Sequence, residues 1–384
     1  MNKEINNFIQ THINKPLAEI ALLLGKNKTL PKEYILNQIN GRRRAKEKYP
    51  FLLDFPNFKF PNQRALAQSS SEETAKYKAK LFAGTSLLDL SGGMGLDSYF
   101  FSKQFENVDY VEQNDELARI TSNNFKILGS RNIDTHSTSA ENLLANNSKK
   151  YDCIYIDPDR RAKKSKAFKI SECEPNVEEL LPKIWELTEN FLIKLSPMLD
   201  IKQALSELPN CKKVNVVALN NDCKELLFLL QKDFTGTPTI SSVNLNKVDL
   251  QKFKFTFEQE QSALSTFNEP QQFLYEPNVA ILKAGAFKLV GAQFGLNKLA
   301  VNTHLYTSEV LKSDFPGRVL KIESISKPKK GLVEKANVVS RNFPQKPEQI
   351  KKKYKVKDGG STFLYACTSD SLGTIFIIAT ALKN

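Results

Sequence analysis

The sequence has few cysteines and few histidines, and this scarcity excludes several kinds of site. The 384 residues include five cysteines and three histidines. No two cysteines form a CxxC pair, and an odd, scattered set does not make a disulfide framework. Three histidines without clustered cysteines do not suggest a zinc site. The sequence therefore predicts a protein without a disulfide framework and without a bound metal.

Long apolar runs are also missing. No stretch approaches the roughly 18 consecutive apolar residues that a membrane span needs. The opening residues, MNKEINNFIQTH, contain no apolar segment of the kind that a secretory signal carries. Apolar residues make up 41% of the chain and charged residues 25%, which is ordinary for a globular protein. We therefore expect a cytoplasmic protein with no membrane partner.

What the sequence has in excess is positive charge. Lysine and arginine number 55 against 42 aspartates and glutamates, so the formal net charge is +13. Such a surface attracts polyanions through its long-range field. A lysine-rich surface without a binding function is the simpler explanation, and the position of the charge along the chain decides between the two.

The patterning of the chain predicts three domains, since 384 residues are too many for one hydrophobic core. Residues 1–80 carry apolar side chains at helical spacing, which indicates a helical domain. Residues 81–265 alternate short apolar runs with helical stretches, as in an α/β fold with a doubly wound parallel sheet. Residues 270–384 are expected to form a smaller α+β domain, with a strand at 279–282 and a turn at 358–360.

A glycine-rich turn follows the first expected strand of the sheet. The strand ends at Asp89, and the turn contains Gly93 and Gly95. Glycines let a backbone bend tightly and approach a ligand closely, and the helix that follows presents free N–H groups. A dinucleotide-binding turn would continue with a third glycine, and Ser98 stands there instead. A nicotinamide or flavin cofactor is therefore disfavoured.

The same turn resembles the first motif of class I methyltransferases, an acid followed by glycines at alternate positions. Ser91 stands where the first glycine is commonest, and its hydroxyl could bond the ligand. On this resemblance the donor is S-adenosylmethionine. Its binding residues would include Asp89, Ser91, Gly92, Gly93, Gly95 and Asp97.

Two later strand ends extend this site. Glu112 ends the second expected strand about 20 residues after Asp89, where a carboxylate can accept both ribose hydroxyls. Gln113 follows it directly. Ala140 and Glu141 follow the third expected strand, where methyltransferases of this class often place an acid or amide against the adenine amino group. An ordinary solvated acid at a strand end is the alternative for Glu112.

Asp157 and Pro158 come directly after a buried strand at 152–156. Ligands of open α/β sheets bind outside the carboxyl ends of the strands, so we expect Asp157 beside the methyl donor. Pro158 restricts the backbone of Asp157 to an extended form. Methyl transfer needs alignment of the acceptor and, for some acceptors, removal of a proton. We therefore predict that Asp157, Pro158 and Arg160 act on the acceptor.

This stretch departs from two known routes of base methylation. It lacks the second proline and the aromatic residue of the amino-group methylase motif, so a base-nitrogen acceptor is not indicated. Covalent attack on a base carbon needs a cysteine at this rim. Cys153 lies within the expected strand instead, so this route is not indicated either.

Basic residues gather directly after Asp157 and again near the C-terminus. Basic side chains beside an aromatic ring, such as Tyr354, suit a phosphate backbone and a stacked base. A third cluster is Arg42, Arg43 and Arg44. Contacts with RNA are predicted for Arg160, Arg161, Lys163, Lys164, Lys166, Lys352 and Lys353.

With these residues the chain resembles a bacterial family of class I methyltransferases that carry a C-terminal THUMP-like domain. The matching stretches are residues 41–48, 70–78, 89–97, 157–161, 302–308, 315–318 and 336–344. The resemblance implies a methyltransferase that uses S-adenosylmethionine, with a small ferredoxin-like segment before the THUMP-like piece. THUMP domains accompany RNA-modifying enzymes, so the implied acceptor is a base of rRNA or tRNA.

Three other functions stay open at this point. The acceptor could be a protein or a small molecule, or the chain could be an inactive RNA-binding protein on a methyltransferase fold. An oxidoreductase is the weakest alternative, because Ser98 stands where a dinucleotide-binding turn has its third glycine. Loss of activity is opposed by the joint presence of the acids and glycines Asp89, Gly93, Gly95, Glu112 and Asp157.

Overall fold

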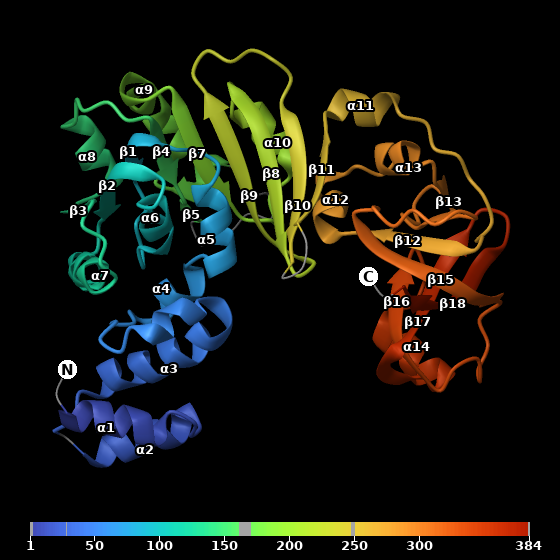
Figure 1. Ribbon diagram of the computed structural model, residues 1–384, viewed down its shortest axis with the longest axis horizontal. Helices are drawn as coiled ribbons and strands as arrows, with labels where there is room; N and C mark the ends of the chain where they lie inside the picture. The colour runs from blue at the N-terminus through green and yellow to red at the C-terminus, as the bar shows by residue number, and fades with distance from the viewer. Residues whose placement is uncertain (1–2, 28, 161–169, 247–249, 383–384) are drawn as a thin grey trace. The chain divides into compact units, whose positions relative to one another are not determined.

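The computed structural model describes residues 3–27, 29–160, 170–246 and 250–382 (Figure 1). The chain divides into two compact units. The first comprises residues 1–212 and 227–236, and the second comprises residues 213–226 and 237–384. Within the described ranges, no helix is long and apolar enough to cross a membrane.

The first unit begins with helices, as the helical spacing predicts. These are α1 (Lys3–His12), α2 (Leu17–Lys26), α3 (Lys32–Lys48), the 3-10 helix η1 (Pro50–Asp54), α4 (Gln63–Gln68) and α5 (Glu72–Ala79). Ile9, Ile20, Leu24 and Ile35 are buried together and hold α1, α2 and α3 against one another. Ser71 caps α5 in a capping box with Thr74, which satisfies backbone donors at the start of that helix.

A parallel sheet follows in the same unit. Its strands are β1 (Gly84–Asp89), β2 (Phe105–Glu112), β3 (Ile133–Ser137), β4 (Cys153–Ile156) and β7 (Asn190–Leu195). The intervening helices are α6 (Leu96–Phe101), α7 (Asp115–Ile127), α8 (Ala140–Ala145) and α9 (Val177–Leu187). The strands lie in the order β7-β4-β1-β2-β3, all in parallel pairs. The order reverses between β1 and β4, and ligands of open α/β sheets bind at such a switch point.

The doubly wound fold expected from the sequence is thereby confirmed, with one extension. Further along the chain come α10 (Ile201–Glu207), β8 (Cys211–Leu219), β9 (Asp222–Gln231), β10 (Thr239–Leu245), β11 (Leu250–Phe255) and α11 (Phe257–Ser262). These strands continue the sheet in the order β11-β10-β8-β9. β10 is parallel to β8 and antiparallel to β11, so the sheet is mixed at this end. The short strands β5 (Asp159–Arg160) and β6 (Cys173–Glu174) pair separately.

The second unit contains a seven-stranded sheet. Its elements are β12 (Phe273–Pro277), α12 (Val279–Ala284), α13 (Leu289–Phe294), β13 (Asn297–Lys298), β14 (Tyr306–Ser308), β15 (Gly317–Ser326), β16 (Lys335–Arg341), α14 (Pro347–Tyr354), β17 (Lys357–Ser369) and β18 (Gly373–Ala381). The strand order is β13-β14-β12-β15-β18-β17-β16. Ile350 and Tyr354 of α14 pack against Leu364 and Phe376 of the sheet. A separate cluster that includes Leu274, Leu320 and Tyr365 forms a second core.

Two local expectations for this unit were wrong. Residues 279–282 form helix α12 rather than a strand, because Asn278 caps the N–H groups of Ala280 and Ile281 and Gly285 ends the helix with a φ of 82°. A short apolar run cannot distinguish a strand from a buried helix. Residues 358–360 lie within β17 rather than in a turn, and the pairing of β16 with β17 shifts register there. Gly359 and Gly360 have φ values of 100° and 87°, as such an irregularity allows.

Candidate active site

The glycine turn after β1 is closely packed, and two of its glycines are required by their surroundings. A Cβ atom on Gly92 would lie 2.1 Å from the ring of Tyr110. Gly95 has a φ of 78°, and a Cβ there would lie 2.4 Å from the side chain of Thr121. Gly93, with a φ of 54°, differs, because its Cβ would meet only the carbonyl oxygen of Ser91 at 3.8 Å. The backbone at Gly93 therefore borders open space, where a ligand could approach it.

Glu112 is held at the end of β2 by the turn itself. Its Oε2 accepts a hydrogen bond from the N–H of Gly93 at 3.0 Å, and its Oε1 accepts one from the N–H of Asn114 at 2.8 Å. An ionised carboxylate has about four acceptor positions, so these two bonds fix its orientation and leave acceptor capacity. Gln113, which follows, is exposed.

The backbone that follows the third strand is hydrogen-bonded to the backbone of Glu112. The N–H of Thr138 donates to the carbonyl oxygen of Glu112 at 3.1 Å. Helix α8 begins just beyond, with Ala140 buried and Glu141 exposed in its first turn. These residues therefore start beside the end of β2, as the expected adenine contact requires. Their contact with a donor stays a prediction.

Asp89 is tied to the residues of the turn, and its contact with a donor stays a prediction. Its side chain is buried, and it accepts hydrogen bonds from the hydroxyl of Ser98 and from the N–H of Ser91. Burial raises the pKa of Asp89 to about 7, against the hydrogen bonds that lower it. Ser98 occupies the place of a third glycine and braces Asp89 instead. The geometry gives Asp89 the role of organising the turn.

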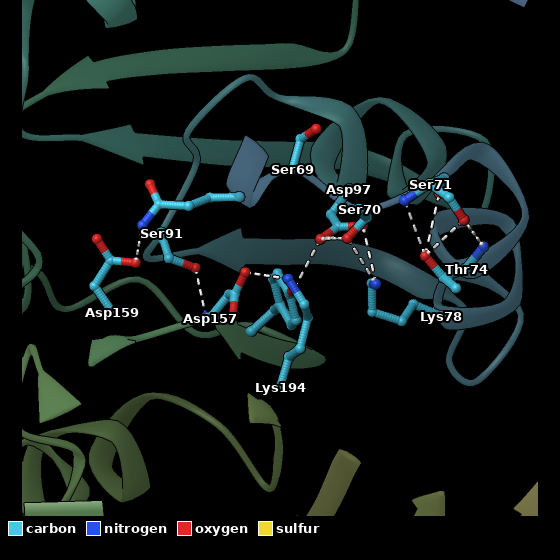
Figure 2. A network of polar contacts seen from close by, with 12 residues as sticks. Ser69, Ser70, Ser71, Thr74, Lys78, Ser91, Asp97, Asp157, Asp159 and Lys194 are labelled. Carbon is cyan, nitrogen blue, oxygen red and sulfur yellow. Dashed lines mark hydrogen bonds and ion pairs between the residues drawn. The ribbon is translucent and has the colours of Figure 1, made fainter. Parts of the chain in front are cut away.

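A polar network joins the segment before β1 to this rim (Figure 2). Oδ2 of Asp97 accepts hydrogen bonds from the hydroxyls of Ser70 and Tyr155 at 2.9 and 2.8 Å. Nζ of Lys78 lies 3.3 Å from Oδ1 of Asp97, and the Lys78 side chain is fully buried. Burial alone would raise the pKa of Asp97, but Lys78 and Lys194 hold it below its usual range. Asp97 is therefore an ionised carboxylate fixed inside the protein.

Asp157 lies at the carboxyl end of β4 and is held on two sides. Its N–H donates to the hydroxyl of Ser91 at 2.6 Å, which ties it to the glycine turn. Its carboxylate forms an ion pair with Nζ of Lys194 from β7 (Figure 2). Burial raises the pKa of Asp157, and Lys194 opposes that shift. The Asp157 side chain remains 32% exposed, so part of the carboxylate is open to a ligand.

The residues after Asp157 are only partly described. Pro158 is buried. Asp159 accepts hydrogen bonds from Arg64 at 3.0 Å and from Gln68 at 2.8 Å, which again connects this rim to the helices before β1. Arg160 belongs to β5, but its side chain lies outside what the structure describes. The predicted RNA contacts Arg161, Lys163, Lys164 and Lys166 lie outside the described residues altogether.

Of the two other basic clusters, the arginine cluster differs from expectation. Arg42 and Arg43 point inward and donate to backbone carbonyls, Arg42 to Pro56 and Arg43 to Ile13 and Lys15. They hold the N-terminal helices together rather than offering charge to a partner. Lys352 and Lys353 are exposed in the last turn of α14.

The ring of Tyr354 does not offer a stacking surface. It packs edge-on against Phe376, with ring centroids 4.8 Å apart, and the residue is 8% exposed. The aromatic neighbour expected to stack on a base beside these lysines is thus part of the core.

A cleft of about 840 Å³ lies next to this site. Its walls come from α3, from residues 59–62 and from α7, with Asn114 and Asp115 at the point nearest the end of β2. Its lining includes Glu33, Glu116, Lys59 and other charges of both signs, so it has no strong electrostatic preference. The described lining does not include the residues of the glycine turn, and we place the donor at the strand ends instead.

Comparison with solved structures identifies the relatives of this chain. The crystal structure of a candidate methyltransferase from Porphyromonas gingivalis W83 is 30% identical in sequence and superposes with a TM-score of 0.88. The match covers 99% of this chain and 98% of that one. This chain belongs to the same family. The methyltransferase family with a C-terminal THUMP-like domain, which the sequence resembles, is thereby confirmed.

Domain models agree for the C-terminal part of this methyltransferase-family protein. Residues 273–316 match a ferredoxin-like domain, and residues 317–381 match a THUMP domain-like model. An rRNA methylase from Streptococcus thermophilus is also similar, at 16% identity and a TM-score of 0.31 over 41% of this chain and 95% of that one. A likeness at that level carries no argument about function. Among curated proteins, none matches the sequence.

The polar network around Asp97 and Asp157 contains residues that were not predicted from the sequence. Lys194 had a detectable signal, since it is a charged residue near the end of the otherwise apolar run 191–195. Lys78 and Ser70 lie in the stretch 70–78 that resembles the family, but that segment is polar and their burial cannot be read from periodicity. Among the described residues, no group of histidine, cysteine, aspartate and glutamate is placed to hold a metal ion.

Proposed function

We propose that this protein transfers a methyl group from S-adenosylmethionine to a base of RNA. The observation that carries the proposal is the convergence of Glu112, the glycine turn and Asp157 at the carboxyl ends of β2, β1 and β4. These strand ends flank the point where the strand order reverses. Donor binding and acceptor chemistry are thus assigned to one rim of the sheet.

The residues present fit the donor. The free acceptor positions of Glu112 suit a pair of ribose hydroxyls, and the open side of Gly93 leaves room for close approach. When bound, S-adenosylmethionine supplies a methyl group on a positively charged sulfur. Lys78 and Lys194 balance the charges of Asp97 and Asp157, so the fit to the donor depends on Glu112 and Gly93.

Asp157 is the residue best placed to act on the acceptor. Lys194 fixes its carboxylate, and the hydrogen bond to Ser91 fixes its backbone. The carboxylate can therefore orient an N–H or O–H group of the methyl acceptor without moving. Since burial raises its pKa, it is also a stronger base than a solvated aspartate and can take a proton from the acceptor. Lys194 would keep the carboxylate ionised before that transfer.

RNA is proposed as the acceptor because of charge and domain composition. The net charge of +13 favours a polyanion, and the basic segment 160–169 follows Asp157 directly in sequence. The match to a THUMP domain-like model fits an RNA substrate. A protein or small-molecule acceptor becomes the better proposal if the purified protein binds structured RNA no better than an unrelated protein of equal charge at several salt concentrations.

The donor assignment has a direct test. Saturation with S-adenosylhomocysteine at about 100 times its dissociation constant should stabilise the protein by about 2.7 kcal/mol, which raises the melting temperature measurably. NAD at the same concentration should give no shift. Stabilisation by NAD alone would instead indicate an oxidoreductase.

Glu112→Ala should weaken binding of S-adenosylhomocysteine by about 1.5–3 kcal/mol, because a charge-assisted hydrogen bond to a ribose hydroxyl is lost. Titration calorimetry measures the change. Glu116→Ala, which removes an exposed carboxylate from the first turn of α7, is the matched control and should bind normally. Unchanged affinity in a folded Glu112→Ala protein would remove Glu112 from the site.

Replacing Lys163, Lys164 and Lys166 by alanine should weaken RNA binding and flatten its salt dependence. Each neutralised phosphate contributes about 0.7–0.9 to the slope of log affinity against log salt, so the slope should fall by roughly two units if all three bind. Filter binding at several salt concentrations measures the slope. The triple variant should bind S-adenosylhomocysteine normally, and an unchanged slope would exclude this segment from the RNA contact.

A further inference from the structure

Several sequence stretches that resemble the family have no role in the methyl-transfer site. Three of them, residues 302–308, 315–318 and 336–344, lie in the second unit. Within that unit the structure brings Arg318 of β15 and Arg341 of β16 to the same carboxylate, that of Glu276 in β12. Stretches from distant parts of the sequence thus meet at one polar cluster, the Glu276 cluster (Glu276, Arg318, Arg341 and Tyr365).

Glu276 is nearly buried and uses both of its oxygens. Oε2 accepts hydrogen bonds from Nη1 of Arg318 and from the hydroxyl of Tyr365, each at 2.7 Å. Oε1 accepts one from Nη2 of Arg341 at 2.6 Å. The residue is 5% exposed. Its carboxylate therefore lies beneath the two guanidinium groups and fixes their positions.

The two arginines retain open surface. Their side chains are 37% and 38% exposed. A guanidinium has five donors. Arg318 donates to Glu276 and to the hydroxyl of Tyr365, and Arg341 donates to Glu276 and to the carbonyl oxygen of Ser340, so each keeps further donors. Nε of Arg341 is buried and has no hydrogen-bond partner among the described residues. The cluster is thus pre-oriented, positively charged by one unit, and short of acceptors.

Aromatic rings border the cluster. The guanidinium of Arg318 lies 4.6 Å from the ring centroid of Phe363, so stacking holds it in one plane. His304 stacks on Phe287 with ring centroids 3.9 Å apart. Burial, together with the charges of Lys298 and Arg341, lowers the pKa of His304 to about 4, so its ring is neutral at physiological pH. The positive charge here belongs to the arginines.

We propose that Arg318 and Arg341, held in place by Glu276, form a binding site for a phosphate group. A pair of fixed guanidinium forks matches the oxygens of a phosphate in geometry and charge. Both side chains keep exposed surface, so N–H donors remain open to a phosphate that approaches from solvent. On the proposed function the phosphate is one of the RNA acceptor. The same chemistry would bind a free phosphate ester.

Calorimetric or NMR titration of the full-length protein with inorganic phosphate tests the site. Wild-type protein should bind phosphate saturably, and Arg341→Gln should bind it about 10- to 100-fold more weakly, as expected for a lost charge-assisted bond. Lys330→Gln is the matched control, because it removes the same charge from an exposed position of the same unit. Arg341→Lys keeps the charge without the fork, so it should also bind more weakly, and it serves if Arg341→Gln does not fold.

The proposal is overturned if wild-type protein does not bind phosphate saturably, or if Lys330→Gln weakens binding as much as Arg341→Gln. A further arm separates the two sources. A short RNA should displace phosphate from the wild type, and its affinity should fall in Arg341→Gln, if the site holds an RNA phosphate. If phosphate binds and RNA does not displace it, the site stands as one for a free phosphate ester. The failure then lies with the proposed RNA contact, whereas binding of S-adenosylhomocysteine would be unaffected in every arm.

Discussion

Asp157→Ala should slow methyl transfer to RNA by about 100- to 10,000-fold, because the acceptor loses the carboxylate that positions it or takes its proton. Donor affinity should change far less, since Glu112 and the glycine turn remain. The rate is measured in a single turnover, with enzyme in excess and labelled S-adenosylmethionine. Asp157→Asn keeps the size of the side chain and removes its charge, so a similar loss in that variant would assign the effect to the carboxylate.

A surface acid serves as the control for this prediction. Asp134 is exposed on β3, and Asp134→Ala should leave the rate near that of the wild type. Near-normal turnover of a folded Asp157→Ala protein would contradict the assignment of Asp157. The ion pair with Lys194 would then have to be a structural feature of the rim.

Lys78→Met should destabilise the first unit by about 1–3 kcal/mol, because Asp97 loses one of the two lysines that keep it ionised. Lys78 has no exposed surface, and it lies 3.3 Å from Asp97, whose side chain is 12% exposed. Urea unfolding followed by circular dichroism measures the loss as a lower midpoint. The hydrogen bonds from Ser70 and Tyr155 to Asp97 remain, so the variant should still fold at low temperature.

The chain contains a close control for this substitution. Lys80 is two residues further along and exposed, and Lys80→Met should unfold at nearly the same urea concentration as the wild type. The double variant Lys78→Met with Asp97→Asn should recover part of the loss, because the charge that Lys78 balanced is removed as well. An unchanged midpoint for Lys78→Met would show that the buried pair does not stabilise the fold.

The position of the site could be predicted from the sequence because it depends on the sheet. Apolar runs ending in Asp89, Glu112 and Asp157 indicate parallel strands, and parallel strands place their carboxyl ends at one edge. The glycine turn adds the close approach of the backbone. These signals are local, and the structure brings Ser91, Gly93, Glu112 and Asp157 to that edge.

The polar network behind the site could not be predicted in the same way. Lys78 reaches Asp97 from α5, and Ser70 reaches it from the turn between α4 and α5. No period in the sequence indicates that these side chains are buried. Arg42 illustrates the opposite error, since a basic run indicates exposed charge but this side chain donates to a backbone carbonyl. Helix α12 was misread because four apolar residues fit either element. For Lys78, Ser70 and Arg42, tertiary contacts set the direction of the side chain.

Transfer of a methyl group to RNA can be tested directly by one measurement. RNA from cells that lack this protein is incubated with the purified protein and methyl-labelled S-adenosylmethionine, and its nucleosides are separated by mass spectrometry. We predict one labelled methylated nucleoside with the wild-type protein and a strongly reduced signal with Asp157→Ala. Label recovered only in protein or in small molecules, or no label from a protein that binds S-adenosylhomocysteine, would contradict the account.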